Sequence, residues 1–174
     1  DNGYMETALE TYNDLAVMLP GEKERGLEYL EKGFKLAKKV GDMGWVSFIG
    51  ANLAFLYVEM GNMNKALSLA EESVALDTKA GNLTHLSPSM NVLAGVHQIL
   101  GEWDKSEQYY KESLNISQRM DDFQSITLSY AYLAWFHLDK GEYAKAREYS
   151  EKVIEVCEKH GEKRLKILSS RWFI

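Results

Sequence analysis

A glycine recurs every 40 residues along most of this 174-residue chain, at Gly21, Gly61, Gly101 and Gly141. A Leu-Ala pair precedes the last three glycines at the same distance, at positions 53–54, 93–94 and 133–134. Self-similarity with a period of about 20–50 residues is the signature of repeat proteins, in which similar units stack side by side. The sequence therefore predicts a row of four related units.

The residues that follow each glycine have the periodicity of an amphipathic helix. In the second unit Ala66, Leu69, Ala70 and Val74 form one apolar stripe. Opposite this stripe, the helices carry Glu and Lys four residues apart, a spacing that stabilises helices: Glu28–Lys32, Glu31–Lys35, Glu107–Lys111 and Glu148–Lys152. Each unit is thus predicted to hold two helices, one before the glycine and one after it.

The chain is therefore expected to be a single all-α domain, 1–174, with no β-strand pattern. The predicted units cover residues 5–40, 43–80, 84–120 and 123–160. Their helices are expected at 5–19, 22–40, 43–60, 63–79, 84–100, 103–120, 123–140 and 143–160, with a further helix from about 163. Ala54, Ala94 and Ala134 are expected where the two helices of a unit lie closest.

These motifs resemble the tetratricopeptide repeat. The second unit supplies the family pattern as Leu53, Ala54, Tyr57, Gly61, Met63, Ala66 and Ala70, and the fourth unit repeats it. The resemblance implies an α-solenoid, a right-handed superhelix of four helical hairpins plus a C-terminal helix. The units are six residues longer than the usual repeat of about 34, as in repeat arms of signalling and regulatory proteins. HEAT-type repeats share this length but lack the Leu-Ala and glycine pattern.

Charge and cysteine content exclude several classes of function. The chain has 20 Lys and Arg against 26 Asp and Glu, a net charge of −6, which disfavours nucleic-acid binding. The single Cys157, expected to be buried, cannot form an internal disulfide framework. No secretory signal opens the chain and no segment is apolar enough to span a membrane, so a cytoplasmic protein is expected. The absence of an initial Met is consistent with a fragment.

No motif of catalysis is present. Gly21 and Gly26 have the spacing of a phosphate-binding loop, but Leu27 and Glu28 replace its Lys and Ser/Thr. His97 and His137 could suggest a metal site, yet both take the position of Tyr57 one and two repeats later, which favours a packing role. We therefore expect a protein that is not an enzyme and needs no cofactor and no metal.

Charges are missing from the first helix of each later unit, at residues 43–58, 82–101 and 123–138. The family resemblance maps a concave groove onto these helices. Its expected residues are Phe48, Asn52, Phe55, Glu59, Asn91, Gly95, Gln98, Leu128, Tyr132, Trp135, Leu138 and Asp139. Aromatic and amide side chains suit an apolar or amphipathic protein segment. The alternative is that Phe55 and Trp135 only pack against neighbouring helices.

The favoured function is a scaffold that binds a partner peptide or helix in this groove. The alternative is a regulatory or sensor arm of a larger signalling or transcription-regulating protein, which binds a small ligand or a sister domain. The C-terminal segment presents Leu165, Leu168, Trp172 and Phe173, an apolar face that predicts self-association.

Overall fold

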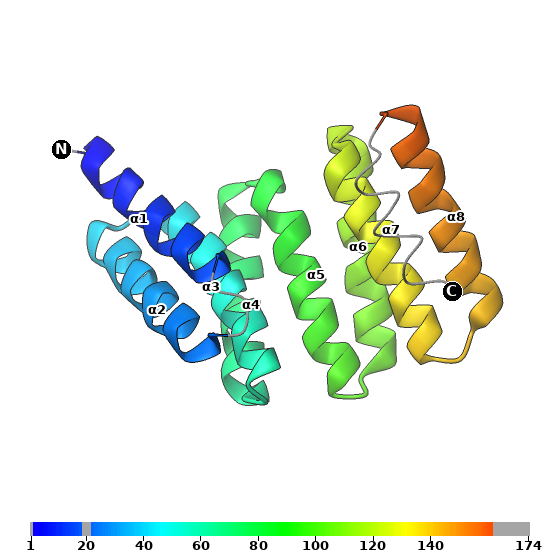
Figure 1. Ribbon diagram of the computed structural model, residues 1–174, viewed down its shortest axis with the longest axis horizontal. Coiled ribbons are helices and arrows are strands. Elements are labelled where there is room, and N and C mark those ends of the chain that lie inside the picture. The colour runs from blue at the N-terminus through cyan, green and yellow to red at the C-terminus, as the bar shows by residue number, and fades with distance from the viewer. Residues whose placement is uncertain (1, 19–21, 162–174) are drawn as a thin grey trace.

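The structure is a computed structural model that describes residues 2–18 and 22–161. The described residues form eight α-helices and no strand, as the sequence predicts. The helices are α1 (Asn2–Val17), α2 (Lys23–Val40), α3 (Met43–Glu59), α4 (Met63–Ala80), α5 (Leu83–Ile99), α6 (Trp103–Met120), α7 (Phe123–Asp139) and α8 (Tyr143–Lys159). Figure 1 shows them following one another along the long axis of the molecule.

The helices pair as antiparallel hairpins, α1 with α2, α3 with α4, α5 with α6, and α7 with α8. Each hairpin also packs on the next, because α2 contacts α3, α4 contacts α5 and α6 contacts α7. In addition α3 contacts α5, and α5 contacts α7, so the odd-numbered helices form a layer of their own. This arrangement is the expected α-solenoid, in which each unit touches mainly its neighbours.

Most helix boundaries lie within two residues of those predicted, and the first helix differs most. Helix α1 begins at Asn2 and ends at Val17, whereas the sequence predicts residues 5–19. The ninth helix expected from residue 163, with its apolar face, lies outside the described residues.

The recurring glycines end the helices in the left-handed backbone conformation. Between the two helices of a hairpin, Gly61, Gly101 and Gly141 have φ angles of 76°, 76° and 74°. A side chain makes this conformation costly, and glycine adopts it freely. Where the N-cap residue of a helix is Asp or Asn, its side chain caps the helix; for example, the Asp42 side chain accepts a hydrogen bond from the Trp45 backbone N–H at the start of α3.

Small residues bring the two helices of each hairpin together. Ala54, Ala94 and Ala134, which are expected where the two helices of a unit lie closest, are buried, and so is Ala66 on the facing helix α4. Cys157 is also buried, which confirms the expectation for that residue. Such close packing leaves little room for larger side chains at these positions.

Buried serines form hydrogen bonds across the hairpins, a feature that the sequence did not predict. Ser47 Oγ donates to the Ser73 carbonyl oxygen at 3.2 Å, and Ser73 Oγ donates to the Ser47 carbonyl oxygen at 3.0 Å. One repeat later, Ser87 and Ser113 make the same reciprocal pair. Because both hydroxyls are satisfied inside the protein, their burial is tolerated.

A buried carboxylate lies between the second and third hairpins. Asp77 of α4 is 1% exposed, and Ser89 Oγ of α5 donates to its Oδ2 at 2.8 Å. One repeat earlier the equivalent positions are Ala37 and Ile49, which are apolar. The contact between neighbouring hairpins therefore differs chemically from one step of the stack to the next.

Candidate functional site

Exposed apolar side chains gather on the helices whose sequences lack charge. Phe55 of α3, Leu128 and Trp135 of α7 are each about half exposed, at 52%, 50% and 51%. Leu138 of α7 and Ile99 of α5 are exposed as well. We call the surface that carries Phe55, Gly95, Ile99, Leu128, Trp135 and Leu138 the odd-helix face.

Phe55 and Trp135 hold the same position two repeats apart, and Gly95 holds it in the helix between them. Because α5 contacts both α3 and α7, this row continues across three neighbouring helices. Gly95 presents no side chain, so the row has a large ring at each end and bare backbone in the middle.

Two of the predicted amide residues tie successive odd-numbered helices together. Asn52 Nδ2 of α3 donates to Asn13 Oδ1 of α1 at 2.6 Å. Gln98 Nε2 of α5 donates to Asp139 Oδ2 of α7, and Gln98 Oε1 accepts from the Tyr110 hydroxyl at 3.1 Å. These bonds join α1 to α3 and α5 to α7.

Two predicted groove residues are only partly exposed, because other rings cover them. Phe48 packs edge-on against Trp45 with the ring centroids 5.6 Å apart, and it also contacts the His85 ring. Tyr132 stacks on Tyr110 at 5.7 Å, and burial raises the pKa of the Tyr132 hydroxyl. Both residues are therefore held in ring clusters beside the helix surface.

The prediction that Asn91 lines an open groove is wrong. Asn91 is 6% exposed, and in the described part of the chain its Oδ1 has no hydrogen-bond partner. The reason is its place on the helix: the equivalent residue of α3 is the buried Ala51, and the equivalent of Asn52 is Val92. Asn91 therefore lies on the flank of α5 rather than on its outer surface.

Glu59 belongs to the packing of α2 against the end of α3. Lys23 Nζ lies 3.6 Å from Glu59 Oε2 and also donates to the Glu59 carbonyl oxygen.

Ile99, at the position of α5 equivalent to Glu59, is exposed and apolar, and the sequence analysis missed it. The 40-residue period was the signal that could have found it, since Ile99 falls between Glu59 and Asp139 in the alignment of repeats.

The packing role predicted for the two histidines is confirmed. His97 and His137 are 4% and 1% exposed, and each ring stacks on a tyrosine of the following helix. His97 lies parallel to Tyr109 at 5.5 Å, and His137 lies parallel to Tyr149 at 5.3 Å. Among residues 2–18 and 22–161, no cluster of three or more His, Cys, Asp or Glu side chains is suited to hold a metal ion.

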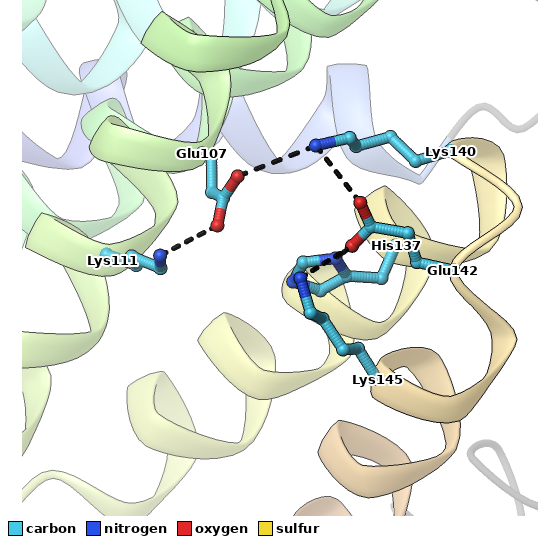
Figure 2. Close-up of polar contacts among 6 residues, drawn as sticks. All are labelled: Glu107, Lys111, His137, Lys140, Glu142 and Lys145. Atoms are coloured by element: carbon cyan, nitrogen blue, oxygen red, sulfur yellow. Dashed lines mark hydrogen bonds and ion pairs between the residues drawn. The ribbon is translucent and has the colours of Figure 1, made fainter.

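A network of charges surrounds His137 where α6, α7 and α8 meet (Figure 2). Lys140 Nζ lies between two carboxylates, 3.7 Å from Glu107 Oε2 and 3.4 Å from Glu142 Oε1. Glu142 Oε2 also lies 2.9 Å from Lys145 Nζ and 2.8 Å from His137 Nδ1. Hydrogen bonds from Lys145 and then His137 lower the pKa of Glu142 from its usual 4.5 to about 2.

The sequence profile of the tetratricopeptide repeat matches residues 46–119, and a second profile of the same repeat matches residues 127–160. The chain belongs to the tetratricopeptide repeat family. Comparison with curated protein sequences gives no match. In the described part of this tetratricopeptide repeat protein, no helix is both long and apolar enough to cross a membrane.

Solved structures show the same fold at low sequence identity. Aspartyl phosphate phosphatase F from Bacillus subtilis is 12% identical with a TM-score of 0.78, and the match covers 95% of this chain and 44% of that one. A Rap protein complexed with Competence and Sporulation Factor is 13% identical with a TM-score of 0.78, covering 88% and 44%. The chain thus spans less than half the length of these two relatives.

A third similar structure is a signal transduction ATPase with numerous domains from Pyrococcus horikoshii, which has a tetratricopeptide repeat sensor. It is 25% identical with a TM-score of 0.66, and the match covers 86% of this chain and 24% of that one.

In this tetratricopeptide repeat chain, the residues that recur are those of the core, and the surface varies. Leu53, Ala54 and their equivalents in the next two repeats are buried. The outward position two residues after Leu53 changes from Phe55 to Gly95 to Trp135. The recurring residues thus build the scaffold, and the residues of the odd-helix face differ from one repeat to the next.

Proposed function

We propose that the odd-helix face binds an apolar or amphipathic segment of a partner protein, with Phe55 and Trp135 as its anchors. The observation that carries the proposal is the pair of half-exposed rings at equivalent positions, separated by Gly95. Aromatic residues of this kind dominate the binding energy of many interfaces. The family match supports a role in protein interaction rather than catalysis.

The surrounding contacts suit this role. No Asp, Glu, Lys or Arg stands between Met43 and Val58 or between Phe123 and Leu138, so a bound segment meets few charges that need water. The Asn52–Asn13 and Gln98–Asp139 contacts hold neighbouring helices in place before binding. A preorganised surface loses less conformational entropy when the partner arrives.

The test is a double variant, Phe55→Ser with Trp135→Ser. Peptides are first selected against the wild-type chain from a phage-displayed random library, and the tightest one is measured by calorimetry. We expect the double variant to bind it at least about 30-fold more weakly, because anchor residues are typically worth about 2 kcal/mol or more. The melting temperature should change by only a few degrees, because both side chains are half exposed.

Tyr143→Ser is the matched control, since Tyr143 is an exposed ring on α8, outside the odd-helix face. This variant should bind the peptide like the wild type. If the double variant instead loses more than about 10 °C in melting temperature, the two rings are core residues, for which truncation costs about 3–5 kcal/mol each. That result, or unchanged peptide binding, contradicts the proposal.

A second candidate is a sensor arm within a longer signalling protein. The observation that favours it is the likeness to the ATPase with a tetratricopeptide repeat sensor, of which this chain spans 24%. A sensor of small ligands would gain stability from its ligand by mass action. A thermal-shift screen against nucleotides and metabolites tests this candidate, and a dose-dependent rise in melting temperature would favour it over peptide binding.

A further inference from the structure

The two layers of helices carry different charges. Every Lys and Arg that lies within a described helix is on an even-numbered helix, α2, α4, α6 or α8. Of the four charged residue types, the odd-numbered helices carry only the acidic ones: Glu6, Glu10 and Asp14 of α1, Glu59 of α3 and Asp139 of α7. The layer that presents the odd-helix face is therefore apolar and negative.

Contacts within the first two hairpins show how α1 aligns with α3. Tyr12 of α1 lies against Gly33 of α2. In the next hairpin Gly50 of α3 lies against Ser73 of α4, and Ser73 is the equivalent of Gly33. Tyr12 and Gly50 thus hold the same position in their hairpins. The shared Leu-Ala pair, at positions 15–16 and 53–54, gives the same alignment.

In this alignment, two acidic residues of α1 take positions that belong to the odd-helix face in later repeats. Glu10 is equivalent to Leu128 of α7. Asp14 is equivalent to Asn52 of α3. The residue before it, Asn13, accepts a hydrogen bond from Asn52, so this part of α1 lies directly beside α3. Helix α1 therefore continues the face with acidic side chains in place of apolar ones.

The carboxylates on α1 differ from the other two in having no partner. Glu10 and Asp14 are exposed, and in the described part of the chain neither makes a hydrogen bond or an ion pair. By contrast, Glu59 lies 3.6 Å from a lysine ammonium of α2, and Asp139 accepts a hydrogen bond from Gln98. The unpaired negative charge of this layer therefore lies at its α1 end.

We propose that the segment bound on the odd-helix face has Lys or Arg at one end, which lies over Glu10 and Asp14 of α1, and apolar residues that cross α3, α5 and α7. Positive charge on the partner complements these carboxylates and fixes the direction in which the segment lies. The proposal rests on the proposed function of this face and adds the charge and the direction of the partner.

The spacing of the helices predicts where the basic residue stands in such a segment. Packed helix axes are about 8–10 Å apart, and an extended chain advances about 3.3 Å per residue. The step from α3 to α1 therefore takes about three residues of an extended segment that crosses the helices. A Lys or Arg is expected at that distance from the apolar residue that lies on Phe55.

The first experiment is a parallel phage selection against the wild type and against Glu10→Gln with Asp14→Asn, here named the neutral-α1 variant. Peptides selected by the wild type should carry Lys or Arg at this spacing more often than the unselected library, and those selected by the variant should not. Apolar peptides without this enrichment overturn the proposal and leave the proposed function in place. If no peptide is selected at all, both fail.

Calorimetry then measures the tightest wild-type peptide and its analogue with Gln in place of Lys and Arg. The neutral-α1 variant should bind the basic peptide about 3- to 10-fold more weakly than the wild type at low salt, as expected for two exposed ion pairs. It should bind the Gln analogue like the wild type. The difference should largely disappear at about 1 M NaCl, where the Debye length is about 3 Å. Equal binding of the basic peptide by both proteins contradicts the proposal.

The matched control is Glu71→Gln with Glu155→Gln, which removes two exposed acidic residues from α4 and α8. It has the same net charge as the neutral-α1 variant and should bind the basic peptide like the wild type. If it weakens binding equally, the peptide is attracted by the overall negative charge and the proposal fails. The neutral-α1 variant should melt at no lower temperature than the wild type, because Glu10 and Asp14 are exposed like charges four residues apart on a helix.

A nitroxide label on the peptide tests its direction on the ¹⁵N-labelled full chain. A label at the basic end should broaden the amide signals of α1 around Glu10 and Asp14. A label at the other end should broaden those of α7 around Leu128. The reverse pattern, or equal broadening of α1 and α7 by both labels, overturns the proposed direction.

Discussion

Ser106 holds a position that the neighbouring repeats fill with alanine. Its equivalents are Ala66 and Ala146, and all three side chains are buried. In the described part of the chain the Ser106 hydroxyl has no hydrogen-bond partner. A buried hydroxyl without a partner loses its bonds to water and gains nothing in return.

We therefore expect Ser106→Ala to raise the free energy of unfolding by about 1 kcal/mol, from the removed hydroxyl and from the higher helix propensity of alanine. Denaturant unfolding followed by circular dichroism measures this difference. Ser113→Ala is the matched control: the Ser113 hydroxyl donates to the Ser87 carbonyl oxygen, so its loss should destabilise the protein. A less stable Ser106→Ala variant would mean that the hydroxyl has a partner.

The charge network of Figure 2 makes a separate prediction at the residue scale. The pKa of Glu142 is lowered to about 2 by Lys145 and His137. A carboxylate with a lowered pKa in the folded state stabilises the protein above its usual pKa of 4.5, and this contribution is lost as the pH falls towards 2. As the pH falls from about 4.5 to 2, the Glu142→Gln variant should therefore lose less stability than the wild-type protein.

The measurement is the melting temperature of wild type and Glu142→Gln at a series of pH values through this window. The difference between the two proteins should shrink as the pH falls, because the wild-type carboxylate becomes protonated. Glu155→Gln, at an exposed position of α8, controls for the loss of one negative charge. A difference that stays constant from pH 7 to pH 2 contradicts the role of this network.

At the scale of elements, the ends of the even-numbered helices show one departure from the repeat. Helices α2 and α4 end at Gly41 and Gly81 with φ angles of 77° and 66°, whereas α6 ends at Asp121 with a φ of 54°. The left-handed conformation costs a residue with a side chain about 1–2 kcal/mol, less for Asp than for most. A negative charge at a helix C-terminus is also unfavourable.

Asp121→Gly should therefore raise the free energy of unfolding by about 1 kcal/mol. The reciprocal change at the equivalent position, Gly81→Asp, should lower it by a similar amount. Both are measured by urea unfolding of the full chain. The Asp121→Ala variant should be less stable than both the wild-type protein, with Asp at this position, and the Asp121→Gly variant. If Asp121→Gly has no effect, the Asp side chain compensates for its backbone conformation through local contacts.

At the scale of the whole molecule, the sequence predicted the scaffold better than the surface. The glycine period and the Leu-Ala pairs are local signals that repeat in phase, so the hairpins and the buried Ala54 followed directly from them. The positions of Asn91 and Ile99 depend on which flank of a helix meets its neighbour, and this cannot be derived from one helix alone. The serine pairs were missed for the same reason, since each joins residues on two different helices.

Asp77 makes the second hairpin chemically different from the first at the surface that docks on the next hairpin during folding. Repeat proteins are prone to misassembly because similar hairpins can dock on the wrong neighbour. If the first hairpin docked directly on the third, Ala37 would face Ser89, and Asp77 would lose the hydroxyl that satisfies its carboxylate. Burying that carboxylate elsewhere costs several kcal/mol. Docking the first hairpin on the third would thus separate Asp77 from Ser89, whereas docking the second hairpin on the fourth would place Asp77 near Ser129, the equivalent of Ser89.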